Sequence, residues 1–425
     1  MSRDLHELAR QESESLRAPL PDLHQVRRRA QTLRIRGRVA SGIVAAALTT
    51  TAVLTLPGLG DEQSPSPAGQ VQRELPPEGR LLLQIGRRVE VLDATTGRSV
   101  VDRGVHGFDL SETGRHVAAT VEVLQRGEGV SLQTELVVED TETGSRTTVT
   151  RAGPRASIGD PAFSPDGTRI AFTLSTWPVD GALNEQRPSH DVLCTTQLEN
   201  VAVRCFRGIG RVFSFDWSPT GDRLVAAGPG DQPVYVVNAA TGDAEVLLPS
   251  GGTQSVRAAL SEMDGYSDRA DQFILPKWSS DGRYVAATAS VTPGGWVPVV
   301  VDASGEFVAS GQPNPHGLQM ISWSPTANLL AHSTGYNGIG PPDVTFGLHV
   351  LDVRTGETRL LHTTNDRRQP AILGIEWSPS GRWLAVDNAL TLDVVDAMGR
   401  ERPYTIDLEQ DDPGDVAETL QDWSI

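Results

Sequence analysis

Short apolar runs alternate with turn signals along most of the chain from residue 80 onward. An aromatic residue and a serine are followed by a turn, usually an arginine, and an apolar pair, and this pattern returns every 45 to 61 residues. The copies are FSPDGTRIAF from Phe163, WSPTGDRLVA from Trp217, WSSDGRYVAA from Trp278, WSPTANLLAH from Trp323 and WSPSGRWLAV from Trp377, with a degenerate copy, LSETGRHVAA, from Leu110. Such regular self-similarity indicates a repeat architecture in which each copy contributes one supersecondary unit.

A second motif lies between successive copies. An apolar strand ends in a polar residue, usually Asp or Asn, and a short turn that usually contains Gly leads into the next strand, as expected for a hairpin. Seven of these hairpins begin at Asp93, Asp140, Gln197, Asn238, Asp302, Asp352 and Asp396. The two motifs together predict four antiparallel strands, A to D, in each repeat, which is one blade of a β-propeller.

The strand count also predicts how the ring closes. Seven C–D hairpins face only six internal A strands, because the first blade begins at strand B with residues 80–86. Residues 419–424 (TLQDWS) resemble residues 214–218 (SFDWS), which form an A strand. We therefore expect an all-β, seven-bladed propeller whose C-terminal strand completes the first blade, so that both ends lie on the face of the A–B turns. Rings of six or eight blades are the alternatives.

The motif W-S-P-D-G-x-x-[IL]-A, as it stands at Phe163, Trp217 and Trp377, resembles the Pro-Asp repeat of TolB-like, WD40-like propellers. The resemblance covers residues 80–425 and implies the fold, but it implies no particular ligand. The TolB family has a separate periplasmic domain ahead of its propeller. This chain has a different N-terminal region, so a role in the Tol–Pal system does not carry over.

One uncharged segment predicts a membrane anchor. Residues 39–56 (VASGIVAAALTTTAVLTL) would span about 27 Å as a helix, enough for a bilayer core. Six arginines between Arg27 and Arg38 precede the segment from Val39 to Leu56, and acidic residues follow it. The positive-inside rule then places residues 1–38 in the cytoplasm as a basic, partly helical arm. A cleaved signal peptide and a buried helix are the alternatives, and the long basic region disfavours both.

The remaining boundaries follow from composition. Residues 57–79 are rich in Pro and Gly and predict an extended linker, and residues 80–425 form the extracytoplasmic domain. The net charge is -17, although residues 1–38 hold nine Arg against five acidic residues. The domain is therefore strongly acidic, which argues against nucleic-acid binding. The abundance of Arg, Ala, Gly and Pro, with Lys277 as the only lysine, suggests a GC-rich, actinobacterial genome.

The two cysteines, Cys194 and Cys205, flank a predicted hairpin at the position of the third C–D pair. With the turn at Glu199 and Asn200 they face each other across the strands. Outside the cytoplasm such a pair is expected to form a disulfide, with two free thiols as the alternative. Two opposed cysteines do not provide a metal site, and we expect no metal and no cofactor.

No catalytic motif accompanies the repeats. The sequence contains no G-x-S-x-G elbow, no Walker loop and no H-E-x-x-H, and its nine histidines are scattered. We therefore expect a non-catalytic protein. A propeller enzyme of the lyase or lactonase type is the disfavoured alternative.

Loop lengths predict a binding face. The A–B and C–D turns are short, whereas the long segments 124–134, 176–190, 249–271 and 335–345 all belong to the opposite, loop-rich face. Loops on a rigid scaffold often carry function. The residues there with binding character are Trp177, Asp180, Asn184, Glu185, Arg187, Tyr266, Tyr336 and Asn337. The expected partner is an envelope protein, a peptide or a glycan, with mere drift in loop length as the alternative.

The N-terminal arm suggests a second possible partner. A short amphipathic start followed by D-L-x-x-V-R-R-R from Asp22 resembles the arms of actinobacterial membrane proteins encoded beside extracytoplasmic-function sigma factors. The arm lacks the cysteines of a zinc-type anti-sigma domain. A signalling component whose arm engages a cytoplasmic regulator is thus an alternative function, and a topogenic tail without a partner is the simpler interpretation.

Overall fold

The computed structural model describes residues 71–72, 76–85, 88–95, 97–103, 105–126, 130–153, 156–176, 190–263, 265–292, 294–315, 317–335, 346–364, 372, 374–387, 391–407 and 417–424. The chain divides into two units, Met1–Ala68 and Gly69–Ile425. All described residues belong to the second unit. The predicted cytoplasmic arm and the segment from Val39 to Leu56 lie outside them. Among the described residues, no helix is both long and apolar enough to cross a membrane.

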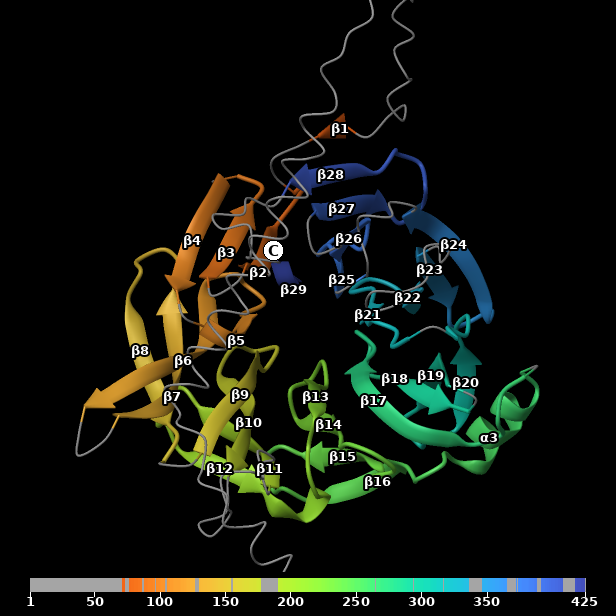
Figure 1. The fold of residues 1–425 in the computed structure, drawn as a ribbon, viewed down its shortest axis with the longest axis horizontal. Coiled ribbons are helices and arrows are strands. Elements are labelled where there is room, and N and C mark those ends of the chain that lie inside the picture. Colours follow the sequence, from red (N-terminus) through yellow and green to blue (C-terminus); the bar gives the residue numbers. More distant parts are fainter. Residues whose placement is uncertain are drawn as a thin grey trace, which may run out of the picture. The chain divides into compact units, whose positions relative to one another are not determined.

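Seven antiparallel sheets surround a common axis in the second unit (Figure 1). Blade 1 contains β29 (Ala417–Ser424), β2 (Arg80–Ile85), β3 (Arg88–Asp93) and β4 (Gly97–Arg103). Blade 2 contains β5 (Val105–Leu110), β6 (His116–Arg126), β7 (Val130–Asp140) and β8 (Arg146–Arg151), and blade 3 contains β9 (Ala156–Phe163), β10 (Arg169–Thr176), β11 (His190–Gln197) and β12 (Val203–Phe206). Blade 4 contains β13 (Ser214–Trp217), β14 (Arg223–Ala227), β15 (Val234–Asn238) and β16 (Ala244–Leu248).

The other three blades repeat this meander. Blade 5 contains β17 (Ala270–Trp278), β18 (Tyr284–Val291), β19 (Gly295–Asp302) and β20 (Phe307–Ser310). Blade 6 contains β21 (Ile321–Trp323), β22 (Leu329–Thr334), β23 (Phe346–Asp352) and β24 (Glu357–Thr364). Blade 7 contains β25 (Gly374–Trp377), β26 (Trp383–Asp387), β27 (Thr391–Asp396) and β28 (Tyr404–Asp407), and β1 (Val71–Gln72) adds a parallel strand at its outer edge. The predicted linker thus ends within the propeller unit.

The ring closes as the strand count predicts. The C-terminal strand β29 lies beside β2 (Figure 1) and pairs antiparallel with it, with Trp423 opposite Leu81 and Ser424 opposite Arg80. It therefore supplies strand A of blade 1, so the seven-bladed prediction is confirmed. The start of β2 and the end of β29 lie together on the face of the A–B turns, also as predicted.

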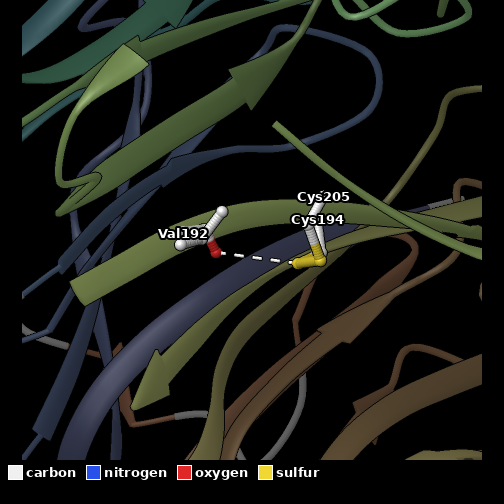
Figure 2. The surroundings of a disulfide bond; sticks show 3 residues. All are labelled: Val192, Cys194 and Cys205. Atoms are coloured by element: carbon white, nitrogen blue, oxygen red, sulfur yellow. Dashed lines mark hydrogen bonds between the residues drawn. A yellow bond between two sulfur atoms is a disulfide. The ribbon is translucent and has the colours of Figure 1, made fainter. Parts of the chain in front are cut away.

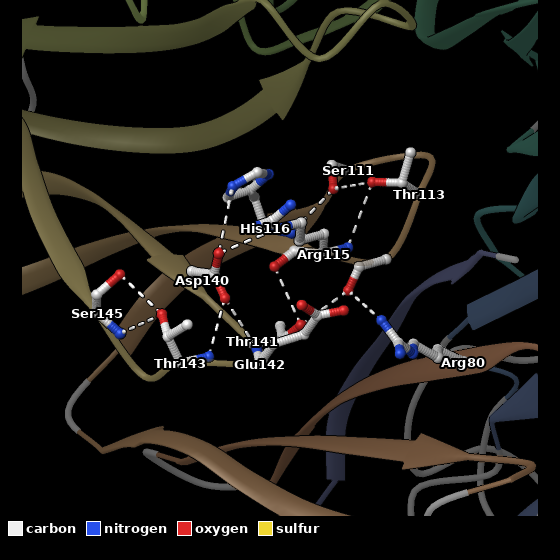
Figure 3. Close-up of polar contacts among 11 residues, drawn as sticks. Arg80, Ser111, Thr113, Arg115, His116, Asp140, Thr141, Glu142, Thr143 and Ser145 are labelled. Carbon is white, nitrogen blue, oxygen red and sulfur yellow. Dashed lines mark hydrogen bonds and ion pairs between the residues drawn. The ribbon is translucent and has the colours of Figure 1, made fainter.

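Both predicted hairpin motifs have a clear local cause. In the A–B turn of blade 3, the Ser164 hydroxyl accepts a hydrogen bond from the Arg169 backbone N–H at 3.0 Å, and Gly167 has a φ of 66°. In the C–D turn of blade 2, Asp140 accepts hydrogen bonds from the backbone N–H groups of Glu142 and Thr143 at 3.0 and 2.9 Å (Figure 3). These bonds hold the pKa of Asp140 down to about 2, with help from its partner Arg115.

The hydrophobic core is divided among the blade interfaces. Each of seven buried clusters joins two neighbouring blades, so no blade is stable without its neighbours. The strands are consequently buried on both faces, and their sequences are nearly continuous apolar runs. Phe163 and Trp217 from the repeated motif lie in the interfaces between blades 2 and 3 and between blades 3 and 4. The aromatic residue of the repeat is thus an inter-blade wedge.

Cys194 on β11 and Cys205 on β12 lie directly opposite each other and form a disulfide, which confirms the predicted pairing (Figure 2). Their Cα atoms are 4.0 Å apart. The bond ties the outer hairpin of blade 3 together, and Cys194 is fully buried.

One of the predicted long loops is wrong, and another contains a helix. The segment from Leu124 to Thr134 is not a loop, because β6 and β7 continue as a ladder that places Arg126 opposite Val130. The segment from Pro249 to Asp271 contains helix α3 (Gln254–Ser261), whose first turn is capped by Thr253. Short-range patterning missed both, since each element is stabilised by its neighbouring strands or blade.

Candidate functional site

A cavity of about 630 Å³ lies where the A strands of blades 2 to 7 reach their A–B turns. Leu110, Ala162, Phe163, Phe215, Trp217, Trp278, Trp323 and Trp377 line it with apolar side chains, together with Pro165, Pro219, Pro325 and Pro379 from the turns. Its polar lining consists of Asp109, Glu112, Ser164, Asp216, Lys277, Ser279, Ser280 and Glu376. Since strands A form the innermost layer of the ring, this cavity is the mouth of the central channel on the short-turn face.

Apart from Glu112 in an A–B turn, the charged lining comes from one position of the repeat. The residue immediately before the first residue of the motif (Leu110 in blade 2, an aromatic residue in the other blades) is Asp109, Ala162, Asp216, Lys277, Ser322 and Glu376 in blades 2 to 7, and we call these six residues the channel ring. Asp422 occupies the same register position in β29, opposite Leu82. A single repeat position therefore brings charges from distant parts of the chain to the propeller axis.

The carboxylates of the channel ring are held by neighbouring blades. Asp109 Oδ2 accepts the backbone N–H of Phe163 at 2.6 Å, and Asp216 Oδ2 accepts that of Trp278 at 2.8 Å. These two bonds connect blade 2 to blade 3 and blade 4 to blade 5. The ring carboxylates are thus fixed in direction before any ligand arrives, which lowers the entropic cost of recognition.

Indole groups add a second set of inter-blade bonds at the same level. The Nε1–H of Trp217 donates to the carbonyl of Ala162 at 3.1 Å, and that of Trp377 donates to the carbonyl of Ser322 at 3.0 Å. Trp323 makes the equivalent bond to Lys277. Trp278 is the exception: it is only 5% exposed, and its indole N–H has no partner among the described residues.

Glu376 and Lys277 complete the charged lining. Glu376 Oε2 accepts the Ser322 hydroxyl at 3.0 Å, and Lys277 Nζ lies 3.7 Å from Asp216 Oδ1. Lys277 follows a bulge in β17 at which Leu275 has a φ of 51°, a conformation that costs free energy for a residue other than glycine. The position of the only lysine of the chain near the axis therefore depends on a strained backbone conformation two residues before it.

Burial shifts the protonation of this site. It raises the pKa of Asp109 from 3.8 to about 7 and that of Glu376 from 4.5 to about 7, while the charge of Lys277 opposes both shifts. Burial also raises the pKa of Asp216, again against Lys277 and the N–H of Trp278. At neutral pH the ring therefore holds carboxyl groups that are partly protonated and ready to exchange protons with a ligand.

The donor set does not resemble a metal centre. Within the described part of the chain, no three His, Cys, Asp or Glu side chains gather closely enough to hold a metal ion. The ring carboxylates stand on blades 2, 4 and 7 and surround a space instead of converging on a point. The expectation that the protein needs no metal or cofactor stays a prediction.

Of the residues predicted for binding, only Tyr266 is among the described residues, and it does not line the cavity. Trp177, Asp180, Asn184, Glu185, Arg187, Tyr336 and Asn337 fall outside the described residues. Tyr266 is described, and its ring covers Gly295, where an added Cβ would meet Tyr266 Cε1 at 2.3 Å. Tyr266 precedes β17, whereas Lys277 lies near the other end of that strand, seven residues after Ala270 and thus about 23 Å along it at ~3.3 Å per residue. The cavity therefore lies at the opposite end of β17 from Tyr266.

The sequence carries a signal for the channel ring, one position ahead of the aromatic motif. At that position the copies contain Asp, Ala, Asp, Lys, Ser, Glu and Asp. Five charged and two small residues at one position of otherwise apolar strands indicate a polar axis.

Comparison with known proteins supports the fold alone. No family model matches the sequence, and no curated protein matches it significantly. An oligogalacturonate lyase from Vibrio parahaemolyticus matches with a TM-score of 0.52 and 13% identity over 76% of this chain and 88% of that protein. An oligogalacturonate lyase in complex with manganese matches with a TM-score of 0.50 and 12% identity over 76% of this chain and 83% of that protein. TolB from Acinetobacter baumannii also matches, with a TM-score of 0.44 and 15% identity over 81% of this chain and 67% of that protein.

Proposed function

We propose that this chain is a membrane-anchored, extracytoplasmic β-propeller that binds a protein, peptide or glycan partner without catalysis. The observation that carries the proposal is the cavity of about 630 Å³ on the propeller axis. Concave sites with apolar walls and a few fixed polar groups are the usual form of a binding site. The loop-rich face with Tyr266 is the second candidate surface for the same function.

The location outside the cytoplasm has two supports. The uncharged segment from Val39 to Leu56 follows an arginine cluster, as in a single-pass anchor with a cytoplasmic N-terminus. The disulfide between Cys194 and Cys205 fits an oxidising compartment. In this arrangement residues 1–38 are placed to contact a cytoplasmic regulator, which makes the signalling function an extension of the binding one.

Affinity capture with matched variants tests the proposal. The full-length chain, solubilised from membranes in detergent, is used to capture partners from envelope extract and to probe a glycan array. We expect one partner to be retained by the wild-type protein and by Tyr266→Ala but lost by Glu376→Gln. The reverse pattern would place the site on the loop-rich face. Equal retention by all three proteins would refute binding at either surface.

An enzymatic function is the second candidate, because the pKa of Asp109 and that of Glu376 both lie at about 7. General acids and bases commonly have pKa values near the working pH. The test is mass spectrometry of the captured ligand after incubation with wild-type protein, Asp109→Asn and Glu376→Gln. Product that forms only with the wild-type protein would establish catalysis, whereas unchanged ligand with all three supports binding alone.

A further inference from the structure

We propose that the channel cavity receives a positively charged organic group of the partner, such as the guanidinium of an arginine or the ammonium of a lysine. The inference rests on the proposed binding function and specifies the chemistry of its ligand. Two observations carry it: the charge of the lining and the spacing of the carboxylates around a cavity on the propeller axis.

The cavity contains more negative than positive charge. Its charged lining consists of Asp109, Glu112, Asp216 and Glu376 against Lys277 alone. Lys277 is 3.7 Å from Asp216, and its charge also lowers the pKa of Asp109 and that of Glu376, so a single cation serves three carboxylates. Partly buried carboxylates that outnumber their counter-ions must either keep a proton or take up a cation. A cationic ligand would therefore meet acceptors whose charge Lys277 compensates only in part.

The spacing of the ring selects an organic cation over a metal ion. Asp109, Asp216 and Glu376 stand on blades 2, 4 and 7, and within the described residues no group of three ligands is close enough for a metal. A cavity of about 630 Å³ is large enough for an extended side chain and part of the segment that carries it. Guanidinium and ammonium groups have several donors each, which can reach carboxylates on different sides of the channel.

Trp278 lines the cavity next to Lys277. Its indole N–H is buried without a partner among the described residues, although the equivalent groups of Trp217, Trp323 and Trp377 all donate to a carbonyl of the preceding blade. The interface between blades 4 and 5 therefore lacks this inter-blade hydrogen bond beside the cavity.

Lys277 acts in this scheme as an internal competitor. All other residues of the Lys and Arg class in the chain are arginines, so Lys277 is the one flexible ammonium group, and it lies beside Asp216. A ligand cation that enters the ring repels Lys277 and competes with it for Asp216. Removing the lysine charge should therefore strengthen cation binding, whereas an anion site built on Lys277 would be destroyed.

Entry of a cation should also release protons. Burial keeps the carboxyls of Asp109 and Glu376 partly protonated at neutral pH, and a bound cation lowers their pKa again. The charged groups that face them are Glu112, Asp216 and Lys277. Binding should consequently tighten as the pH rises from 6 to 8, because fewer protons then compete with the ligand.

The test uses N-acetyl-arginine amide as the probe and the uncharged N-acetyl-citrulline amide as its isosteric control, titrated calorimetrically into the full-length chain in detergent. We expect the arginine probe to bind at least about tenfold more tightly than the citrulline probe. Asp216→Asn and Glu376→Gln should each weaken it several-fold, and Lys277→Met should strengthen it. Titrations in two buffers of different ionisation enthalpy should show proton release at pH 7.

Several results would overturn the inference. These are equal binding of the two probes, no binding at about 10 mM probe, loss of binding in Lys277→Met, or tighter binding of Ca²⁺ than of the arginine probe. Thermal melts of each variant establish that it is folded. If partner capture depends on Glu376 while the arginine probe does not bind, the proposed function stands and the cationic ligand is excluded.

Discussion

Replacing Asp109 by asparagine removes an ionisable group from the channel but keeps an oxygen that can accept the N–H of Phe163. Burial raises the pKa of Asp109 from 3.8 to about 7. A difference of this size corresponds to about 4 kcal/mol between the charged and protonated forms in the folded state. Because the channel opens to water, we expect roughly 1–2 kcal/mol in practice.

The sign follows from proton linkage. Below about pH 4 the carboxyl group is protonated in both the folded and the unfolded chain. Between pH 4 and 7 the unfolded chain loses this proton while the folded chain keeps it, so the free energy of unfolding decreases as the pH rises. Above pH 7 the carboxyl group is ionised in both states, so the free energy of unfolding decreases no further through this group. Asparagine does not titrate, so the stability of Asp109→Asn relative to the wild-type protein should increase by roughly 1–2 kcal/mol between pH 5 and pH 8.

The comparison between the two proteins is needed because other groups titrate in the same range. Burial lowers the pKa of His332 to about 3, so this histidine makes the folded state more stable as the pH rises towards 6.5. The contribution of His332 has the opposite sign to that of Asp109, and it is the same in the wild-type protein and in Asp109→Asn. It therefore cancels when the free energies of unfolding of these two proteins are subtracted.

The assay is urea unfolding followed by tryptophan fluorescence at half-unit steps from pH 5 to pH 8. Asp281→Asn is the matched control, since hydrogen bonds from Ser279 and Arg283 offset its burial and hold the pKa of that turn carboxyl below its usual value. Asp281 stays ionised throughout the range, so its difference from the wild-type protein should not change with pH. A pH-independent difference for Asp109→Asn would mean that Asp109 is ionised in the folded state, and the burial argument would fail.

Three further predictions concern the scaffold. Trp377→Phe should lower the free energy of unfolding by about 1 kcal/mol more than Trp278→Phe, because only the first loses an indole hydrogen bond; urea titration measures the difference, and equal losses would contradict it. Replacing Cys194 and Cys205 together by serine should cost roughly 2–3 kcal/mol in the same titration, and an unchanged midpoint would show that the disulfide contributes nothing. Deleting residues 417–425 should abolish cooperative thermal unfolding, since blade 1 loses its inner strand, and an unchanged melting temperature would refute closure.

Much of the scaffold could be predicted from the sequence, because each blade repeats the same turn motifs and apolar strands. Serine followed by a glycine turn predicted the A–B hairpins, and all seven polar residues expected to start the C–D hairpins do end their strands. The spacing of Cys194 and Cys205 predicted their pairing across one hairpin. Closure was predictable as well, since a missing A strand and a matching C-terminal segment leave one solution that removes the open edge.

The channel ring was decided by tertiary structure. Successive members of the set Asp109, Asp216, Lys277 and Glu376 are 61 to 107 residues apart along the chain, and only the curvature of the ring brings them to one axis. Their shifted pKa values depend on burial, and burial is a property of the assembled blades. Local sequence determines hairpins because turns and strand pairs form between near neighbours. The candidate site required all seven blades, because its charges interact only after the ring has closed.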